Sequence, residues 1–517
     1  MLAIVSSLLA SAAFPPLDMG LVAWIALAPF LFSLRSAGAG RAAGLGFLFG
    51  FLHFFVSFFW SLKIPQVTFP ILVASSSLSG LYFFVFGCLH RFICRDAGRW
   101  GIVGVPALWV ALEYARSNAL FLALPWNLLG HSQRGLLPVI QIADITGVYG
   151  LSFLIVMFNH AISEIPDRFR IRREGPAGGD SRNASTGNPW IPLLGATLAL
   201  VLVLSYGWYR LSCPAEGKRL RVALVQTNVL TRDDMTLKEQ LQSLLRYEEF
   251  TMQAARQGPA LIVWPASSLP GPITFKWILS QIERISIRSG CYLLVGGSGR
   301  EKDSSKTIGA KPSYANSEFL FSPQGRMEAV YNKVYLLPFN EFIPLKDHIR
   351  WPRWISANIP NFKAGEKLTL FQVSDGRFGT PICWENMFPD FFRRFVASGA
   401  NFMVGVTNEG FMGDSAGPYQ SLAMYVFRAV ENRIAMVRSS PTGISAIIQP
   451  DGRVTGRVEG KNGKDLYVSG VLIDDIPLAN GKSFYTRHGD VFALATIGAL
   501  ALLIPTSAIR SFRRKPS

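Results

Sequence analysis

The feature that most constrains the fold of this 517-residue chain is a series of apolar runs, each long enough to cross the hydrocarbon core of a bilayer. These runs lie at 18–34, 43–62, 70–93, 101–118, 139–162, 190–209 and 490–509. Half of the residues are hydrophobic and only 16% are charged, which is too apolar for an average soluble protein. The sequence therefore predicts a polytopic α-helical membrane protein with a soluble part.

A shorter apolar run at 2–14 precedes the others. A cleaved signal segment would need a positively charged region before its apolar stretch, and this run has none. We interpret it as the first of about eight membrane helices, with a signal segment as the alternative. The predicted organisation is seven transmembrane helices in 1–209, a soluble domain at 215–488, a final helix at 490–509 and a basic tail at 510–517.

The basic residues indicate how the helices cross the membrane. The formal net charge is +17, and Lys and Arg favour the cytoplasmic ends of membrane helices. One set of alternate connections carries most of them: Arg35, Arg41, Arg91, Arg95, Arg99, Arg168, Arg170, Arg172, Arg173, Arg182, Arg510, Arg513, Arg514 and Lys515. The opposite set holds Lys63 and Arg134, with Arg116 at a helix edge. This asymmetry predicts that both termini are cytoplasmic and that the soluble domain lies outside. The charge then suits anionic lipid head groups, and nucleic acid is not an expected partner.

The soluble segment alternates short β-branched runs with helical stretches, which predicts an α/β sandwich with its own core. The predicted strands are Leu220–Gln226, Ala260–Trp264, Tyr292–Gly296, Ser317–Phe321, Leu368–Val373, Phe378–Ile382, Phe402–Val406, Ile434–Arg438 and Ser445–Gln449. The predicted helices are Leu237–Gln257, Ile273–Ser289 and Ser421–Asn432. In such sheets function collects at the carboxyl ends of strands. Three segments with suggestive residues follow predicted strands there: Trp264-Pro265-Ala266-Ser267, Cys383-Trp384-Glu385 and Thr407-Asn408-Glu409-Gly410.

Cys383 ends an apolar, strand-like run, and the residues after it indicate a turn into a helix. A thiol on such a turn is exposed to substrate and near backbone N–H groups that stabilise an oxyanion. From this segment alone, a buried cysteine that only fills space is an equally good interpretation.

Lys333 lies fifty residues upstream of Cys383, among strand-forming residues. An ammonium there would stabilise an oxyanion and depress the pKa of a nearby thiol. Without Cys383, a surface lysine on a strand would be the simpler interpretation. Glu341 follows in a loop flanked by Pro and Phe, as a polar anchor for a substrate amine or for Lys333.

The five cysteines and six histidines form no CxxC pair and no HExxH motif, so we expect no metal site. Two further features allow two interpretations each. Glu113 and Arg116 are either a functional pair within a membrane helix or, as we favour, an intrahelical pair that anchors it. The aromatic segment 351–355 either enters the membrane interface or packs within the soluble domain.

Three segments in chain order carry a specific resemblance. Trp264-Pro265, Tyr331-Asn332-Lys333 and Cys383 followed by Glu385 resemble the Glu-Lys-Cys pattern of the nitrilase superfamily. With several membrane spans before this domain and one after it, the chain resembles the bacterial apolipoprotein N-acyltransferase family. Segments 107–116, 124–133, 147–153 and 411–418 are also similar to that family's motifs. The resemblance covers essentially the whole chain, and it implies a nitrilase-like αββα sandwich.

One position departs from the pattern. The family's general base is the Glu directly after Trp-Pro, and this chain has Ala266 there. A methyl group cannot accept a proton, and Ser267 and Ser268 are poor bases near neutral pH. We interpret Ala266 as a single local change, engineered or recent, in an otherwise complete site; a natural variant that uses Glu341 or Glu385 as the base is the alternative. Because general acid–base groups contribute ~10²–10⁴-fold, the chain is expected to be slow.

The resemblance implies transfer of an acyl chain from a phospholipid to the α-amino group of the diacylglyceryl-cysteine of an apolipoprotein. It implies a monomer in the bacterial inner membrane, with the catalytic domain on the periplasmic side and no cofactor. Cys383 would carry the acyl group as a thioester and Lys333 would stabilise the oxyanion, with position 266 as the base. The expected supporting or substrate-binding residues are Glu341, Glu385, Trp384, Trp264 and Asn408.

Two other functions stay open at this point. A membrane-anchored nitrilase-type amidase would use the same residues on a small amide. A catalytically silent relative that binds lipoprotein or lipid is supported by Ala266 alone.

Overall fold

The computed structural model describes residues 1–96, 100–174, 190–213, 217–232, 234–300, 314–353, 359–360 and 362–513. The chain forms two compact units. The membrane unit comprises Met1–Cys213, Ser415–Ala423 and His488–Ser517, and the sandwich unit comprises Pro214–Asp414 and Met424–Arg487. Most of the arginine-rich connection that we predict to be cytoplasmic, and the end of the basic tail, lie outside the described residues.

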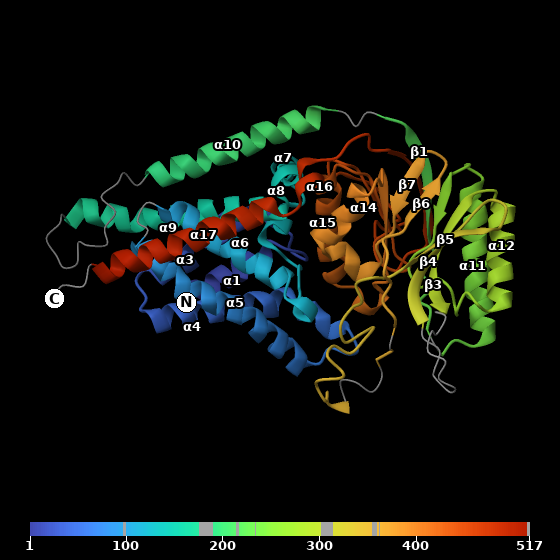
Figure 1. Cartoon of the computed structure of the whole chain (residues 1–517), viewed down its shortest axis with the longest axis horizontal. Coiled ribbons are helices and arrows are strands. Elements are labelled where there is room, and N and C mark those ends of the chain that lie inside the picture. The colour runs from blue at the N-terminus through green and yellow to red at the C-terminus, as the bar shows by residue number, and fades with distance from the viewer. Residues whose placement is uncertain are drawn as a thin grey trace. The chain divides into compact units, whose positions relative to one another are not determined.

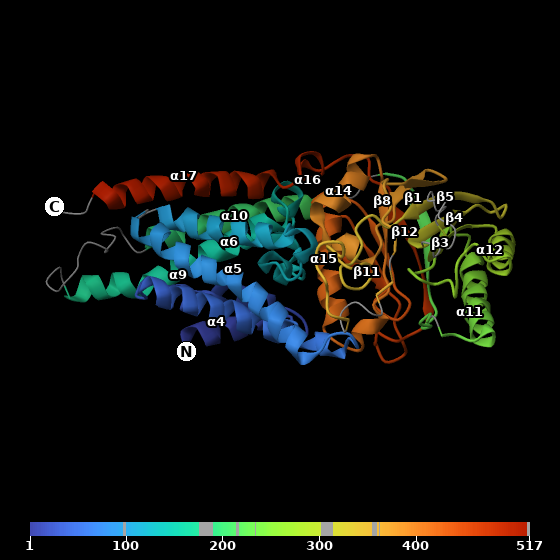
Figure 2. The same ribbon diagram turned by 60° about the horizontal axis from the view of Figure 1, so that its bottom comes forward.

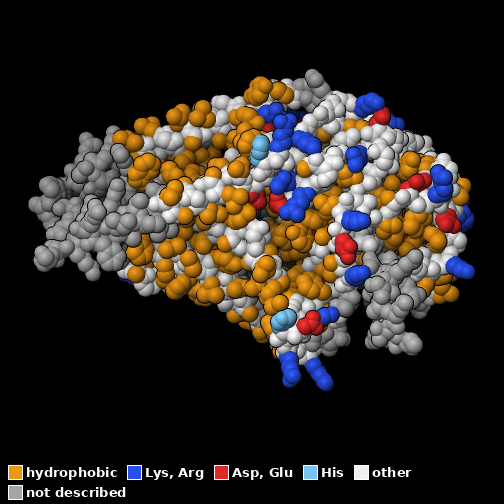
Figure 3. Space-filling view, in the orientation of Figure 1, with side chains coloured by type: hydrophobic (Ala, Val, Ile, Leu, Met, Phe, Trp, Pro, Cys, Tyr) orange, Lys and Arg blue, Asp and Glu red, His pale blue; other side chains and the backbone are white. Residues whose placement is uncertain are grey.

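The membrane unit is helical, and its long helices run alongside one another (Figures 1 and 2). Its helices are α1 Leu2–Ala12, α2 Ala23–Ala26, α3 Ala28–Arg35, α4 Ala39–Ser57, α5 Phe69–Asp96, α6 Gly101–Ser117, α7 Leu137–Ile140, α8 Ala143–Thr146, α9 Val148–Glu174, α10 Trp190–Ser212 and α17 Val491–Arg513. Within the described ranges, four stretches are long and apolar enough to cross a membrane: Ala39–Ser57, Phe69–Cys94, Val148–Pro166 and Trp190–Ser212. Hydrophobic side chains cover much of the visible face of this unit (Figure 3).

The predicted span at 18–34 forms an apolar helical segment, Gly20–Arg35, whose regular helix is interrupted once. The chain forms a 3₁₀ turn and then α2 and α3, which are separated at Leu27. Asn159 on α9 stabilises the break, because its Oδ1 accepts hydrogen bonds from Leu27 N at 2.8 Å and Ala28 N at 2.9 Å. Its Nδ2 donates to Ala23 O at 2.9 Å. A side chain from another helix thus satisfies backbone groups that the break frees.

The predicted span at 139–162 is also interrupted, at Gly147. This residue has a φ of +63°, in the left-handed region that glycine adopts without penalty, and it ends α8. The continuous helix α9 therefore begins only at Val148. The segment predicted at 2–14 is helical as α1, which has 11 residues and is shorter than a bilayer-spanning helix.

Helices α4 and α5 approach each other through small residues. A Cβ added at Gly46 would lie 2.0 Å from Phe83 O, and one added at Gly87 would lie 2.1 Å from Ala42 O. The two backbones are therefore nearly in contact, as is common for helix pairs in membranes.

Glu113 and Arg116 on α6 are both buried, and they bond both within the helix and to the loop that follows it. Within α6, Glu113 Oε1 accepts from Trp109 Nε1 at 2.9 Å. Glu113 Oε1 accepts from Leu129 N at 2.8 Å. Arg116 donates to Leu124 O at 2.7 Å and to Trp126 O at 2.9 Å. The two side chains therefore also hold this loop against α6, a role that neither interpretation from the sequence included.

The first turns of α15, Gly417–Asn432, belong to the membrane unit through Gln420. The Gln420 side chain is buried and its amide is bonded on every side. Its partners are Trp60 Nε1 at 3.1 Å, Trp126 Nε1 at 2.9 Å, Pro15 O at 2.9 Å and Ser57 O at 3.1 Å.

The sandwich unit has two six-stranded sheets. The first has the order β12 Gly470–Pro477, β1 Arg219–Gln226, β2 Leu261–Val263, β3 Tyr292–Arg300, β4 Tyr314–Phe321 and β5 Met327–Asn332. The second has the order β11 Val454–Arg457, β10 Ala446–Ile448, β9 Met436–Ser439, β8 Phe402–Val406, β7 Gly376–Gly379 and β6 Leu370–Val373. Each of the nine predicted strands overlaps an observed one, whereas β5, β11 and β12 were not predicted.

Helices cover the outer faces of both sheets. Helices α11 Leu237–Ala255 and α12 Lys276–Ser289 share a hydrophobic core with the first sheet. Helix α14 Pro389–Ala397 contacts β7 of the second sheet. The remainder of α15 packs on β8, where a Cβ added at Gly405 would lie 2.5 Å from the Tyr425 ring. The predicted αββα sandwich is confirmed (Figure 1).

Candidate active site

Cys383 stands at a sharp turn after β7. The strand ends at Gly379, and Cys383 is the first residue of a 3₁₀ helix that runs to Met387. Its φ is +50°, a left-handed conformation that residues other than glycine rarely adopt and that is often found at functional sites. The residue as a whole is partly exposed. The turn therefore keeps Cys383 at the border of the core and not in its interior.

Glu385 holds this turn in place. Its buried carboxylate accepts four hydrogen bonds: from Ile382 N at 2.7 Å, Tyr331 Oη at 2.8 Å, Val334 N at 2.7 Å and Tyr335 N at 2.9 Å. Burial raises the pKa of Glu385 to about 7, although the Lys333 ammonium and these hydrogen bonds oppose the shift. Glu385 thus ties the Cys383 turn to the segment that carries Lys333.

Lys333 follows β5 and is only 1% exposed, so it is not a surface lysine. Its Nζ lies 2.7 Å from Glu341 Oε2. The Glu341 carboxylate also accepts from Leu337 N at 2.6 Å and Asn316 Nδ2 at 2.9 Å. Burial acts to lower the pKa of Lys333, but nearby negative groups, Glu341 foremost, raise it above its ordinary value. The site therefore contains a buried, positively charged ammonium.

The thiol itself needs a base. Burial raises the pKa of Cys383 above its ordinary value, even though the Lys333 ammonium and the Thr407 hydroxyl act to lower it. A thiol with a raised pKa is protonated near neutral pH, and the protonated form is a poor nucleophile. A neighbouring group must accept its proton during attack.

Ala266 is buried in the loop after β2, where the resemblance expects that base. The loop is fixed to β3, because Ser268 Oγ donates to Gly296 O at 3.0 Å. Trp264, just before it, points into the core beneath α11: its Nε1 donates to Thr251 Oγ1 at 2.9 Å and its ring stacks on Tyr247. Trp264 is therefore part of the support under this loop, and the structure does not bring its side chain to the Cys383 turn.

Trp384 and Asn408 lie on two different segments of the site region. Trp384 is partly exposed and its ring meets that of Phe388 edge to face at 5.5 Å. Asn408 follows β8, and its Oδ1 accepts from Gly410 N at 3.3 Å. The predicted segment after β8 also supplies Thr407, whose effect on the thiol was not anticipated from the sequence.

Two further groups near this segment form a buried ion pair. Arg438 on β9 donates to Glu409 Oε1 at 2.5 Å, and both side chains are almost fully buried. The Arg438 guanidinium also lies over the Tyr425 ring at 4.6 Å. Neither charge was assigned a role from the sequence, since an ion pair between two strand ends needs the sheet order to be known.

The aromatic segment at 351–355 is described as far as residue 353. The Trp351 ring meets Phe339 edge to face at 5.0 Å, and its Nε1 donates to Pro344 O at 2.7 Å. These contacts favour packing within the sandwich unit for Trp351.

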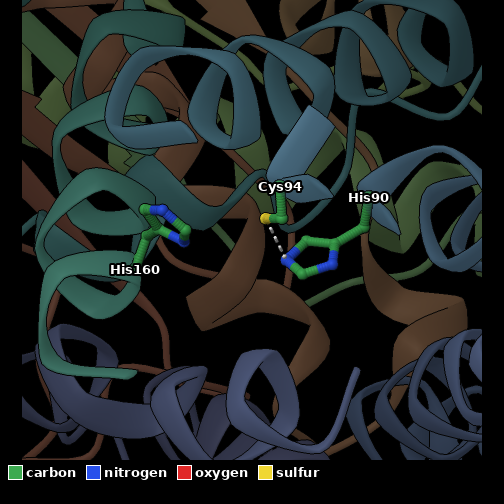
Figure 4. Close-up of side chains that lie close together, drawn as sticks. All are labelled: His90, Cys94 and His160. Carbon is green, nitrogen blue, oxygen red and sulfur yellow. Dashed lines mark hydrogen bonds between the residues drawn. The ribbon is translucent and has the colours of Figure 1, made fainter. Parts of the chain in front are cut away.

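The membrane unit contains a cluster of possible metal ligands that motif searches cannot find. His90 and Cys94 are one turn apart on α5, and His160 comes from α9 (Figure 4). Their ligand atoms all lie within 4.8 Å of one another, and His90 Nε2 is 3.4 Å from Cys94 Sγ. Imidazole and thiolate suit zinc and related ions. The expectation of no metal site rested on spacing along one segment, which does not detect a cluster built from two helices.

Comparison with known proteins assigns both parts of the chain. Residues 221–485 match the carbon-nitrogen hydrolase model, and residues 6–161 match the apolipoprotein N-acyltransferase N-terminal domain model. The fold and these matches define a membrane-bound acyltransferase built on a carbon-nitrogen hydrolase domain.

Relatives that match nearly the whole chain show which family within this class it belongs to. The chain is 34% identical over 528 residues to the apolipoprotein N-acyltransferase of Geobacter metallireducens, covering 100% of this chain and 95% of the relative. It is 27% identical over 522 residues to that of Chlorobaculum tepidum, covering 96% and 93%. The chain belongs to the apolipoprotein N-acyltransferase family. Among solved structures, it is similar to a mutant of the Nesterenkonia AN1 amidase from the nitrilase superfamily, at 18% identity and a TM-score of 0.38, covering 56% of this chain and 97% of that one.

Proposed function

We propose that this chain takes an acyl chain from a phospholipid and transfers it to the α-amino group of a diacylglyceryl-cysteine at the N-terminus of an apolipoprotein. The observation that carries the assignment of roles is the Cys383 turn. A partly exposed cysteine stands on a strained turn, and Glu385 joins that turn to the segment of a buried, charged lysine. This arrangement suits covalent acyl transfer.

In the first half-reaction, Cys383 Sγ attacks the carbonyl carbon of the phospholipid ester while its proton passes to a base. The Lys333 ammonium stabilises the negative charge that develops on the carbonyl oxygen. The ester C–O bond then breaks, and the leaving alcohol oxygen takes up the proton. A thioester on Cys383 and a lysophospholipid result.

In the second half-reaction, the free amine of the acceptor attacks the thioester carbonyl carbon. The C–S bond breaks, one amine proton is transferred through the base to the departing sulfur, and an amide forms. Glu341 keeps Lys333 charged and positioned, and Glu385 keeps the turn in place. Trp384 and Asn408 are the proposed substrate contacts, and position 266 is where the resemblance expects the base.

We also propose that the chain works as a monomer in the inner membrane, with the sandwich unit on the periplasmic side and both termini cytoplasmic. The distribution of Lys and Arg supports this orientation. Both substrates would be anchored in lipid, which agrees with an acyltransferase that carries its own membrane helices.

Mass spectrometry of the full chain mixed with phospholipid and a diacylated lipopeptide tests this function. We expect an acyl adduct on Cys383 without acceptor, and a triacylated peptide with it. Release of ammonia from small amides without either product would favour an amidase. Binding of the lipopeptide without any adduct, even after Ala266→Glu, would favour a silent relative.

A further inference from the structure

Glu318 on β4 is a buried carboxyl for which the reaction described above has no role. Its side chain is 0% exposed, and neither carboxylate oxygen has a hydrogen-bond partner among the residues that the structure describes. Burial raises its pKa well above the ordinary value. Buried carboxyls are usually paired or hydrogen-bonded, because an unpaired one is costly. Glu318 therefore calls for a functional explanation.

This carboxyl lies beside Ala266. The position that a Cβ would occupy on Gly296 is 2.5 Å from Glu318 Oε1 and 2.7 Å from Ala266 Cα. Gly296 is the strand partner of Glu318, so the carboxyl reaches across β3 toward the loop after β2. Any side chain at position 296 would collide with it. Because Gly296 has no side chain, there is room for the Glu318 carboxyl next to Ala266, the position where the resemblance expects a glutamate.

Glu318 also faces the same side of the sheet as the residues that contact the site. Glu318 lies directly opposite Tyr331 in the β4–β5 pair, and opposite residues share a face. The Tyr331 hydroxyl donates to Glu385. Asn316, two residues before Glu318 and so on the same face, donates to Glu341. The row of side chains that includes Glu318 thus supports the Lys333 and Cys383 segments.

Three other carboxylates of the site are already engaged. Glu385 accepts four hydrogen bonds, and Glu341 accepts two and pairs with Lys333. Glu409 forms the buried ion pair with Arg438. Their oxygens already accept hydrogen bonds or pair with a cation, so they are less free to take the Sγ proton. Glu318 can gain or lose a proton without breaking any contact that the structure describes.

We propose that Glu318 is the proton-transferring base of this enzyme, so that the carboxyl missing after Trp264-Pro265 is supplied from the neighbouring strand β4. This assignment rests on the proposed acyl transfer. The Glu318 carboxylate accepts the Sγ proton, directly or through one water, as Sγ bonds to the ester carbon. The resulting acid gives that proton to the alcohol oxygen as the C–O bond breaks. In the second half-reaction it accepts a proton from the attacking amine and returns it to Sγ as the C–S bond breaks.

The experiment compares five full-length proteins: the parent, Glu318→Gln, Ala266→Glu, the double variant Ala266→Glu with Glu318→Ala, and Glu328→Gln as control. Glu328 is an exposed acid on the adjacent strand β5. The rate of thioester formation on Cys383 from phospholipid is followed by intact-protein mass spectrometry. We expect Glu318→Gln to lose ~10²–10⁴-fold in rate, as is usual for removal of a general base. Glu328→Gln keeps the parent rate.

The rescue variant separates a chemical role from a structural one. Moving the carboxyl back to position 266 while removing it from 318 should restore most of the parent rate. Ala266→Glu alone should gain less, because two adjacent buried carboxyls cannot both ionise easily. Glu318→Gln should not lower the unfolding temperature, since it replaces an unpaired buried carboxyl by a neutral group of the same shape.

Parent-like thioester formation by Glu318→Gln would overturn the assignment. An inactive parent alongside an active Ala266→Glu variant would overturn it as well, because Glu318 would then not replace the missing base. If no protein of the set, Ala266→Glu included, forms a thioester or a triacylated product, the proposed acyl transfer itself fails.

Discussion

Asn159 in the membrane unit and Glu318 in the sandwich unit are equally buried, yet they differ completely in their hydrogen bonding. Asn159 is bonded to four backbone groups, those of Leu27, Ala28, Ala23 and Ile155, at 2.8 to 2.9 Å. Glu318 has no hydrogen-bond partner among the described residues. The Asn159 side chain stabilises the fold with all its donors and acceptors. The Glu318 carboxyl makes no such bonds and can exchange a proton without breaking any.

The same contrast holds inside the candidate active site. Glu385 and Glu341 are saturated and position other groups, while Glu318 is not. This bears on the interpretation of Ala266. A single recent or engineered change at that position would leave only an empty space where a carboxyl had been. A carboxyl from another strand lies beside Ala266 instead, which favours an exchange of positions within the site.

Among groups with a chemical role, replacement of Cys383 is expected to lower the rate of acyl transfer most. We predict that Cys383→Ala abolishes thioester and product formation, a loss on the order of 10⁴-fold or more, because no other group can carry the acyl chain. The unfolding temperature should change little, since the partly exposed Cys383 is not required for the core. Mass spectrometry and thermal unfolding check the two parts. Cys213→Ser, at an exposed cysteine outside the site, is the control and should remain active.

Lys333 is expected to have both a catalytic role and a role in the stability of the fold. Lys333→Met should lower the rate of thioester formation by about 10²–10³-fold through loss of oxyanion stabilisation. It should also destabilise the protein by about 3–5 kcal/mol, because Glu341 is left buried without its partner.

The double variant Lys333→Met with Glu341→Gln separates the two effects. It removes the uncompensated charge and should recover stability without recovering activity. Recovery of the acylation rate in the double variant would show that Lys333 acts only by neutralising Glu341.

Much of the fold follows from local pattern, and what does not follow depends on distant partners. β12 was not predicted because its residues are mostly half-buried and show no alternation; it forms a strand by pairing with β1, far away in sequence. Hydropathy also cannot reveal the break at Leu27, since Asn159 that stabilises it lies on another helix.

The site divides in the same way. Cys383, Lys333, Glu341 and Glu385 could be proposed from residue types and spacing. Glu318 could not, because only the pairing of β3 with β4 brings it beside Ala266. A signal was present, since a glutamate interrupts the otherwise apolar end of the strand at 317–321.

The pH dependence of the free energy of unfolding tests the raised pKa of Glu385. Burial raises the folded-state pKa of Glu385 to about 7, above the value near 4.3 expected when unfolded. Its contribution to stability is therefore full below about pH 4 and is lost as the pH rises through about 7, a change on the order of 3 kcal/mol. Thermal unfolding of Glu385→Gln between these pH values should give a flatter curve than the parent. The Glu328→Gln control should keep the parent slope, and an equally steep curve for Glu385→Gln would contradict the raised pKa.

The smallest expected effect tests whether a buried side chain with all its hydrogen bonds made, such as Asn159, has a structural role. Asn159→Ala removes the side chain that bridges the break between α2 and α3, and it should lower the free energy of unfolding in detergent by about 1–2 kcal/mol, given the modest strength of hydrogen bonds within membranes. Thioester formation per folded molecule should stay at the parent rate. Asn118→Ala, which removes an exposed side chain at the end of α6, should cost less than about 0.5 kcal/mol. If both variants lose the same free energy of unfolding, full hydrogen bonding of a buried side chain does not indicate a structural role. The lack of hydrogen bonds at Glu318 would then no longer support a catalytic role.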